Sequence, residues 1–380
     1  MTILNYKIKY PIVAAIGLLI ALISVFYLSE YGKLPRLIIV LLGIGIISLS
    51  TGNKKYIAEA KALVIIVVIA LSVKVTVLEA YIVPTGSMEK TIMTGDFLIG
   101  SRFVYGMRTP NWIGIPYTDT GIFIPSIKFP KFREPAKGDV LIFNYPRDKY
   151  VKYVKRCIAG PGDTLIIKNK QVYINGEISI LPKNYVFSQP EIPINIKQSE
   201  IYLSSDKNLN KDNMGPIIIP KKGDYFTIND STNWRELLPI MLMEGHTARL
   251  SKDDNYFVFT LQDPNELWRR KENISVFDNY VIGGNNESGS LLTPWSRSIK
   301  DHYFNKYLII DNKPVSEWSG YEVRQNYYWA MGDNRDDSLD SRYWGLIPEN
   351  FILGEALFAY FSLDLKSWMP RLNRIGTIIR

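Results

Sequence analysis

Three apolar runs lie within the first 78 residues and constrain what the N-terminal part of this chain can fold into. The runs cover residues 11–28, 37–50 and 62–78. The first is long enough to cross a bilayer as a helix, whereas the second is shorter and either spans together with its flanks or lies partly in the interface. The third is interrupted by Lys74 alone, whose long stem can reach the headgroups. We therefore predict that residues 1–78 form a membrane anchor with two or three transmembrane helices.

Basic residues between these runs orient the chain. Lys7 and Lys9 precede the first run, and Lys54, Lys55 and Lys61 cluster before the third. Loops rich in lysine stay on the cytoplasmic side of a membrane. With either two or three spans, everything after residue 78 is then predicted to lie outside the cytoplasm. No small-residue cleavage site clearly follows the first run, which favours retained anchors over a cleaved signal peptide.

The composition argues against several kinds of site. The net charge of +8 comes from lysines and arginines that are interspersed with acidic residues, which indicates a solvated surface and not a nucleic-acid interface. The single cysteine, Cys157, permits no intrachain disulfide and no multi-cysteine metal site. The chain has only two histidines, His246 and His302, which argues against a Ser-His-Asp triad and against a histidine-rich zinc site. We expect no metal, no organic cofactor and no nucleic-acid partner.

From residue 79 onward the pattern is mostly β. Short strand-like runs are separated by Gly, Pro, Asn and Asp turns, and Asn175-Gly176 is a strong hairpin signal. One helix is predicted over Trp234–Met243. We expect antiparallel β-sheets in residues 79–165 and 325–380, interrupted by an inserted β-rich lobe, residues 166–324. The predicted strands are Asp96–Ser101, Asp139–Tyr145, Val151–Ile158, Thr164–Ile166, Gln171–Ile174, Tyr225–Ile228, Tyr256–Leu261, Tyr307–Ile310, Tyr327–Ala330 and Ala356–Phe361.

Two short segments carry a candidate nucleophile and a candidate base. In residues 84–96, Ser87 follows a glycine, which lets the backbone turn tightly and leaves the hydroxyl accessible. In residues 150–163, Lys155 lies on a predicted strand beside apolar residues that would desolvate its amine. Lowering a lysine pKa from about 10.4 to near 7 lets the neutral amine act as a general base. Each pattern alone is more typical of a plain turn and of an exposed strand lysine.

A third segment, Met331–Gly345, intersperses aspartates and arginines with two serines and has glycine near both ends. Such a pattern predicts a tightly hydrogen-bonded loop. Its oxygen atoms also suggest calcium, but the glycine and the terminal glutamate of an EF-hand are missing at the required spacing. Two arginines would moreover compete for the carboxylates. We therefore favour a structural loop.

Together, the three segments resemble bacterial type I signal peptidase (leader peptidase), the membrane-bound serine–lysine dyad protease that removes signal peptides from exported proteins. The matching parts cover roughly residues 60–165 and 325–380, and their order and position after a membrane anchor also agree. The motifs that carry the resemblance are Pro84-Thr-Gly-Ser-Met88 with Gly95-Asp96, then Lys137-Gly-Asp139, Tyr153-Val-Lys-Arg156 and Pro161-Gly-Asp163, and finally Gly332-Asp-Asn-Arg-Asp-Asp-Ser338 with Asp340-Ser-Arg342.

The resemblance implies catalytic roles for four residues. Ser87 resembles the nucleophile, and Lys155 resembles the general base. Ser338 falls where the family has a serine that hydrogen-bonds the lysine amine and orients it. Thr85 falls where the family has a serine whose hydroxyl helps to form the oxyanion hole, with the Ser87 amide as the other donor. A serine–lysine pair needs no imidazole, which makes the shortage of histidine intelligible.

Further residues are assigned by the same resemblance. Asp340 and Arg342 resemble a structural ion pair that stiffens the third segment. Thr85 replaces the commoner serine, and Lys90 stands where many members have proline. Pockets for small substrate side chains would be lined by Val83, Met88, Ile92, Leu98, Ile142, Tyr153 and Val154.

The sequence thus predicts a mainly β, membrane-anchored signal peptidase I. It would cleave N-terminal signal peptides from secretory preproteins after a small residue, using a Ser-Lys dyad. The resemblance places it as a multi-pass protein of the bacterial cytoplasmic (inner) membrane, with the lipid bilayer beside it, its catalytic core of residues 79–165 and 325–380 on the extracytoplasmic side, and the secretion translocon nearby.

Two alternative functions were weighed. A repressor-type Ser-Lys autoprotease is opposed by the three apolar runs and by the absence of a DNA-binding helix pair. A catalytically inactive, membrane-anchored binding module for exported chains is opposed by the joint presence of Ser87, Lys155 and Ser338.

Overall fold

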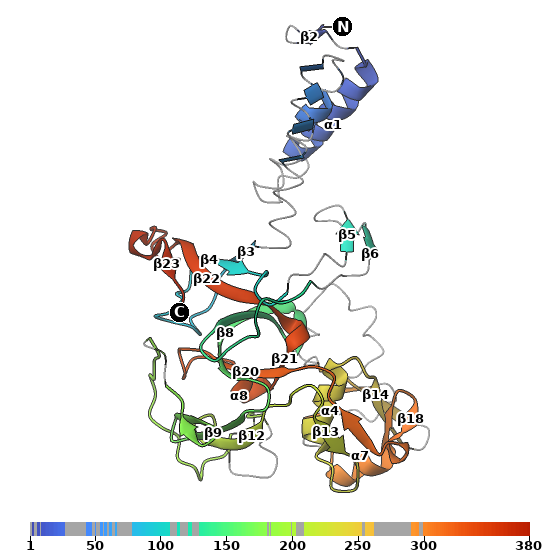
Figure 1. Cartoon of the computed structure of the whole chain (residues 1–380), viewed down its shortest axis with the longest axis vertical. Helices are drawn as coiled ribbons and strands as arrows, with labels where there is room; N and C mark the ends of the chain where they lie inside the picture. The colour runs from blue at the N-terminus through green and yellow to red at the C-terminus, as the bar shows by residue number, and fades with distance from the viewer. Residues whose placement is uncertain are drawn as a thin grey trace. The chain divides into compact units, whose positions relative to one another are not determined.

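The fold was analysed in a computed structural model, whose described residues divide into two compact units (Figure 1). One unit comprises Met1–Glu79 and Gly106–Lys131, and the other comprises Ala80–Tyr105 and Phe132–Arg380. We treat each unit by itself. The structure describes residues 2–3, 6–7, 9–26, 43–47, 50, 54–55, 57–58, 61–62, 65–66, 78–106, 112–114, 121–123, 129–180, 182, 184–198, 200–202, 209–252, 255–261, 290–295 and 299–380.

The first unit contains one long helix, α1 (Pro11–Phe26), which corresponds to the first apolar run up to residue 26. A close approach requires glycine on this helix, because a Cβ at Gly17 would lie 2.7 Å from the carbonyl oxygen of Gly43. The described part also contains short helical pieces, such as residues 43–47, and two small hairpins: β1 (Thr2–Ile3) with β2 (Tyr6–Lys7), and β5 (Trp112–Gly114) with β6 (Gly121–Phe123).

Within the part of the chain that the structure describes, no helix combines the length and the apolarity needed to cross a bilayer. Helix α1 has 16 residues. The second and third apolar runs, residues 37–50 and 62–78, lie for the most part outside the described residues.

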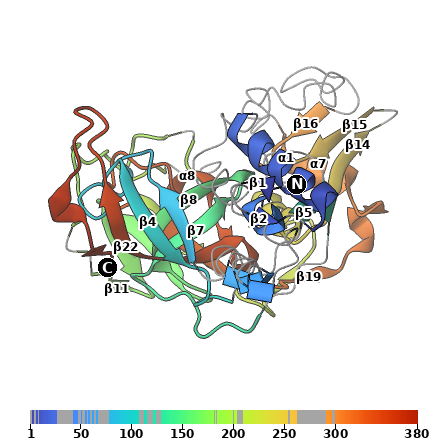
Figure 2. The same cartoon turned by 90° about the horizontal axis from the view of Figure 1, so that it is seen from above.

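The second unit is built around a mainly antiparallel, eight-stranded sheet. Its strand order is β21-β20-β8-β7-β22-β4-β3, and β23 pairs with β22. Strands β4, β22, β7 and β8 of this sheet are labelled in Figure 2. The strands are β3 (Leu78–Ile82), β4 (Asp96–Ser101), β7 (Val140–Tyr145), β8 (Asp148–Ala159), β20 (Tyr327–Met331), β21 (Ile347–Pro348), β22 (Ile352–Ser362) and β23 (Thr377–Ile378).

Residues 166–324, which we call the insert, leave this sheet after β8 and return to it at β20. A four-stranded sheet, ordered β11-β10-β9-β12, opens the insert. The Asn175-Gly176 turn has positive φ angles of 54° and 87° and joins β10 to β11, as its sequence predicts. The strands are β9 (Thr164–Lys168), β10 (Gln171–Ile174), β11 (Glu177–Ile178) and β12 (Met214–Ile218).

The rest of the insert combines a second sheet, ordered β16-β15-β14-β17-β18, with two helices and the pair β13-β19. Strands β15 and β16 run parallel. The elements are β13 (Tyr225–Thr227), α4 (Trp234–Met243), β14 (Ala248–Lys252), β15 (Asn255–Phe259), β16 (Ser290–Leu292), α7 (Asp301–Tyr307), β17 (Leu308–Ile310), β18 (Lys313–Pro314) and β19 (Gly320–Glu322). Short helices elsewhere are η2 (Val315–Glu317), α8 (Ser341–Trp344), η3 (Glu349–Phe351) and η4 (Leu372–Arg374).

Strand β20 joins the insert to the main sheet because it is buried on both faces. Trp329 and Met331 belong to a core cluster that includes Leu238 of α4 and Phe304 of α7. Tyr328, on the opposite face, belongs to a different cluster with side chains of β7 and α8. Side chains alternate along a strand, so one strand serves two cores. The insert and the main sheet therefore share apolar side chains.

The predicted strands and the predicted helix Trp234–Met243 are present, most with their ends shifted by one to four residues. The mainly antiparallel β prediction is confirmed. Strands β12 and β14 and helix α7 were not predicted, because β12 contains Gly215 and Pro216 and β14 carries three polar residues among five. Neither composition favours strand formation.

Candidate active site

Ser87 lies in a tight turn between β3 and β4. The carbonyl oxygen of Met88 accepts hydrogen bonds from the backbone N–H of Thr91 at 3.1 Å and of Ile92 at 2.8 Å. The Met88 side chain is only 1% exposed and anchors the turn in the core. Ser87 itself is half-buried, so its hydroxyl faces a solvent-accessible groove while its backbone is held.

Lys155 projects from β8 toward this turn. Its Nζ lies 2.5 Å from Ser87 Oγ and 3.1 Å from the carbonyl oxygen of Val154. Only 4% of the residue is exposed. The amine is therefore removed from water and placed at hydrogen-bond distance from a serine hydroxyl, which is the contact a general base requires.

The surroundings of Lys155 favour its neutral form. Burial lowers the pKa of Lys155 from its ordinary 10.5 to about 8. The carboxylates of Asp340 and Asp333 oppose this shift in pKa, and the Arg342 guanidinium adds to it. Desolvation is the largest effect, so a substantial fraction of the amine is unprotonated near pH 8.

Asp333 connects the three segments that the sequence singled out. Its carboxylate accepts two hydrogen bonds from the Arg156 guanidinium, at 2.8 and 2.7 Å, and one from the Thr91 hydroxyl at 2.6 Å. Its backbone N–H also points at the Met88 sulfur, 3.4 Å away. The Asp333 side chain is fully buried. One carboxylate thus ties the Ser87 turn and the Lys155 strand to the third segment.

The third segment also contacts the Ser87 turn directly. The backbone N–H of Asn334 donates to the carbonyl oxygen of Ser87, and the Asn334 side chain donates to that of Gly86, both at 3.1 Å. A Cβ at Gly332 would lie 2.4 Å from the Ser87 carbonyl oxygen and 2.3 Å from Ser338 Oγ. Both serines therefore occupy the space that a side chain at position 332 would need, so only glycine fits there.

The ion pair predicted for Asp340 and Arg342 is present and buried. Arg342 donates two hydrogen bonds of 2.9 Å to the carboxylate, and the backbone N–H of Gly332 donates a third at 3.1 Å. Although burial alone raises the pKa of Asp340, the adjacent guanidinium and these hydrogen bonds lower it below its usual value. The carboxylate stays charged and holds the backbone of Gly332.

Ser338 is 7% exposed, and its buried Oγ has no hydrogen-bond partner among the described residues, although it helps to lower the pKa of the Asp340 carboxylate. Among the hydrogen bonds of the described residues, none joins Ser338 to Lys155. Thr85 is exposed and lines the groove beside Ser87. The orienting role of Ser338 and the oxyanion role of Thr85 remain predictions.

The groove above Ser87 and Lys155 has a volume of about 410 Å³. Five of the seven predicted pocket residues line it, namely Val83, Met88, Ile92, Tyr153 and Val154. Leu98 and Ile142 do not, since both are fully buried in the core cluster behind Met88 and Ile92. They support the groove without lining it.

Several lining residues were not predicted. Ile82 and Val151 lie one or two positions outside the motifs used, on the two strands that form the walls, and strand alternation could have indicated them. Lys152, Asp337 and Leu339 also line the groove, and nothing in their pattern distinguishes them from surface residues.

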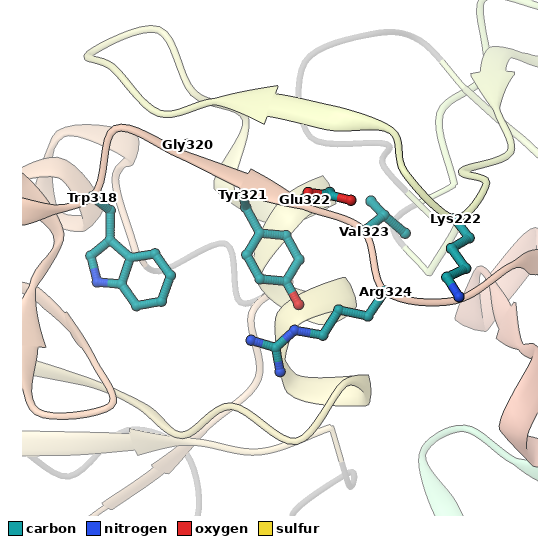
Figure 3. Close-up of a pocket in the computed structure, with 7 residues that line it drawn as sticks. All are labelled: Lys222, Trp318, Gly320, Tyr321, Glu322, Val323 and Arg324. Carbon is teal, nitrogen blue, oxygen red and sulfur yellow. The ribbon is translucent and has the colours of Figure 1, made fainter.

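A second hollow, of about 450 Å³, lies on the insert and holds none of the predicted site residues (Figure 3). The Arg324 guanidinium lies over the Tyr321 ring there, 5.9 Å from its centre. Its lining is Lys222, Trp318, Gly320, Tyr321, Glu322, Val323 and Arg324. Among the described residues, no group of three or more His, Cys, Asp or Glu side chains is placed to hold a metal ion.

The chain matches the family described as signal peptidase, peptidase S26, over residues 56–234 and 284–361. Curated relatives include proteins named signal peptidase I from three bacteria. The protein from Buchnera aphidicola (Schizaphis graminum) is 28% identical over 306 residues, which are 79% of this chain and 74% of the relative. That from Rickettsia typhi is 26% identical, covering 86% and 89% of the two chains, and that from Pseudomonas aeruginosa is 25% identical, covering 82% and 75%.

Lys90, which stands where proline was expected, generates a prediction. Its φ of 71° is left-handed, and the proline ring fixes φ near −65°. We expect Lys90→Pro to destabilise the protein by more than about 1 kcal/mol, and Lys90→Gly to stabilise it by up to about 1 kcal/mol. Thermal unfolding of both variants measures this.

Lys366→Gly serves as the control, because Lys366 is an exposed loop lysine outside the set of residues with positive φ. It should leave stability unchanged or lower it slightly. Equal stability of the Lys90→Pro variant and the wild type would contradict the left-handed turn.

Proposed function

The chain belongs to the S26 family of signal peptidases, and we propose that Ser87 and Lys155 are the catalytic dyad with which it acts as a signal peptidase I. The observation that carries the assignment is the 2.5 Å contact between Lys155 Nζ and Ser87 Oγ. A buried amine with a pKa lowered to about 8 is a suitable base for a hydroxyl at this distance. This pairing also argues against an inactive binding module.

The reaction follows from these positions. Neutral Lys155 takes the proton from Ser87 Oγ as this oxygen attacks the carbonyl carbon of the scissile peptide bond. The C–N bond then breaks, and the Lys155 ammonium returns the proton to the leaving amine. A water molecule then gives a proton to Lys155 and attacks the acyl ester; the ester C–O bond breaks, and the Lys155 ammonium returns the proton to Ser87 Oγ.

We assign stabilisation of the oxyanion to the backbone N–H of Ser87 and the Thr85 hydroxyl. Thr85 lies on the same groove wall as Ser87, and its exposed hydroxyl is available to a bound substrate. Such donors act most strongly on the charge that develops in the transition state. In this proposal Ser338 orients the Lys155 amine, Asp340 holds the backbone of Gly332, and Lys155 alone moves protons.

The substrate we propose is a secretory preprotein, cut after a small residue at the end of its signal peptide. The groove walls come from β3, with Tyr81 to Val83, and from β8, with Val151 to Val154. Two strand walls suit an extended peptide. Tightly packed Met88 and Ile92, 1% and 0% exposed, leave room only for small side chains near Ser87.

We further propose that residues 1–78 anchor the protein in the bacterial cytoplasmic membrane by two or three spans, with the catalytic part on the extracytoplasmic side near the secretion translocon. The three apolar runs and the lysine-rich segment around residues 54–61 support this orientation. Residues 79–165 with 325–380 would form the catalytic core.

Loss of either dyad member should abolish cleavage of a preprotein. We expect Ser87→Ala and Lys155→Met each to lower kcat/KM by about 10⁴-fold or more, and the double variant to be no worse than either, because the pair acts as a unit. Gel-based cleavage with N-terminal sequencing of the product measures this. Ser316→Ala and Lys168→Met, at exposed positions, are controls with wild-type rates. Substantial turnover by Lys155→Met would refute the assignment of the base.

Activity should depend on pH through Lys155. Its folded pKa of about 8 means that the amine is mostly protonated at lower pH, so kcat/KM should rise as pH increases through about 8 and then level off. On the acidic side, kcat/KM should fall about tenfold per pH unit. Initial rates across a pH series test this. A profile that stays flat through pH 8 would contradict a lysine base.

Topology is testable apart from catalysis. If everything after residue 78 lies outside the cytoplasm, protease added to spheroplasts should digest the insert, residues 166–324. A cytoplasmic protein in the same cells, which should remain intact, is the control. Protection of the insert in spheroplasts together with digestion in inverted vesicles would reverse the proposed orientation.

A further inference from the structure

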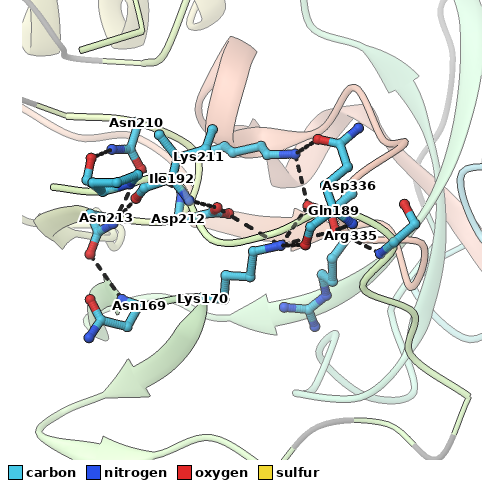
Figure 4. A network of polar contacts seen from close by, with 12 residues as sticks. Asn169, Lys170, Gln189, Ile192, Asn210, Lys211, Asp212, Asn213, Arg335 and Asp336 are labelled. Carbon is cyan, nitrogen blue, oxygen red and sulfur yellow. Dashed lines mark hydrogen bonds and ion pairs between the residues drawn. The ribbon is translucent and has the colours of Figure 1, made fainter. Parts of the chain in front are cut away.

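Asp336, a residue of the third segment to which the proposed mechanism gives no role, lies in a dense polar network (Figure 4). Its side chain is fully buried. Lys211 Nζ lies 2.8 Å from Oδ1, and Lys170 Nζ lies 3.1 Å from both carboxylate oxygens. The backbone N–H groups of Ser188 and Gln189 donate to Oδ2 at 2.8 and 2.9 Å. One carboxylate therefore receives two ammonium groups and two backbone donors.

These donors come from the insert, and the lysines are themselves held in place. Lys211 is 4% exposed, and its amine also donates to the Gln189 side chain at 2.9 Å. Lys170 also donates to the carbonyl oxygen of Gln189 at 2.7 Å, and its side chain is 10% exposed. Asp212, 3.9 Å from Lys170 Nζ, supplies a second carboxylate, so two lysines face two aspartates. Although burial raises the pKa of Asp336, the hydrogen bonds from Lys211, Gln189 and Lys170 lower it to about 2.

The backbone at Lys170 indicates that its side chain is needed. Asn169 and Lys170 form the two-residue turn between β9 and β10, with φ of 50° and 65°. Such turns favour glycine at the second position, and the neighbouring Asn175-Gly176 turn of the same sheet has it. Position 170 therefore has a lysine although its left-handed backbone conformation favours glycine, and the lysine amine contacts the Asp336 carboxylate.

The network is linked to the dyad through a single stretch of backbone. Val186 of the insert pairs with this stretch: its N–H donates to the Asp333 carbonyl oxygen at 2.8 Å, and its own carbonyl oxygen accepts from Arg335 at 2.9 Å. On the other side, Asn334 donates to the carbonyl oxygens of Ser87 and Gly86. Residues 332–336 are thus held between the insert and the Ser87 turn. At Gly332, atoms of Ser87 and Ser338 approach so closely that no side chain would fit.

We propose that Lys170 and Lys211 are positioning residues for the reaction. By binding the Asp336 carboxylate, they hold residues 332–342, the loop that carries Asp336, against the Ser87 turn. The proposal rests on the Ser87–Lys155 dyad and assigns the insert a part in catalysis. Neither lysine touches the substrate. Their effect reaches Lys155 through the loop, so loosening the loop admits water to the buried amine and lengthens its contact with Ser87.

Two lysine variants of the full chain test this by preprotein cleavage. Lys170→Gly removes the amine and relieves the left-handed turn, two effects of opposite sign on stability, so its thermal unfolding is measured alongside its kcat. Lys211→Met removes the other amine at similar length. We expect each to lower kcat by about 10- to 100-fold with little change in KM, since misplaced catalytic groups cost rate and not binding. Lys168→Met, an exposed lysine on the same hairpin, is the matched control and should retain wild-type kcat.

Two further readouts separate positioning from a merely structural role. The rise of kcat/KM with pH should move to higher pH in both variants, because Lys155 regains water and its pKa returns toward the ordinary value; the charged groups that face it, Asp333, Asp340 and Arg342, are unchanged. In an Asp336→Asn background, Lys211→Met should lower kcat little further than Asp336→Asn alone, because both changes remove the same contact.

Wild-type kcat in both lysine variants would overturn the proposal. So would a fall in kcat that follows a loss of thermal stability while the pH profile stays in place, since the lysines would then serve the fold alone. Ser87→Ala in the same assay distinguishes a failure of the proposed dyad from a failure of the positioning role. If it cleaves like the wild type, the proposed dyad fails; if it is inactive while the lysine variants are normal, only the positioning role fails.

Discussion

The proposed site depends on shielding the Lys155 amine from water without placing an unpaired carboxylate beside it. Lys155 is almost fully buried, and the two nearest acidic side chains are already engaged, Asp333 by Arg156 and Asp340 by Arg342. None of the ion pairs among the described residues includes Lys155. A buried lysine with a free carboxylate at hand would keep its proton and could not act as a base. The arginines therefore serve the chemistry by occupying the acids.

The proposed catalytic groups come from distant parts of the chain and are held together by the third segment, Met331–Gly345. From within this segment, Asp333 bonds to Thr91 next to the Ser87 turn and to Arg156 of β8. Gly332 permits this close packing, because atoms of Ser87 and Ser338 occupy the space that a side chain at position 332 would need. A buried polar network of this kind has little tolerance for partial loss, since each remaining group would be left unpaired.

Much of this could be predicted from the sequence, and the limits have physical causes. Ser87 and Lys155 were identified because they lie in short motifs, and the strands because apolar residues alternate along them. Leu98 and Ile142 were assigned to the pockets by the resemblance, but neither lines the groove, since a motif match gives the position of a residue in the chain and not the depth of its side chain. Lys170 and Lys211 were missed altogether. A lysine in a polar loop carries no local sign that its amine meets a carboxylate 166 or 125 positions away.

The two-sided burial of β20 has a consequence for how the molecule comes into being. Ser87 and Lys155 are synthesised early, but the strand and loop that complete their surroundings follow the whole insert. Because Trp329 packs against side chains of the insert, β20 has no complete binding face until that region has folded. Pairing across so long a stretch of chain is intrinsically slow. Peptidase activity therefore requires that nearly the whole chain has been synthesised and folded, so a nascent chain that lacks β20 is inactive.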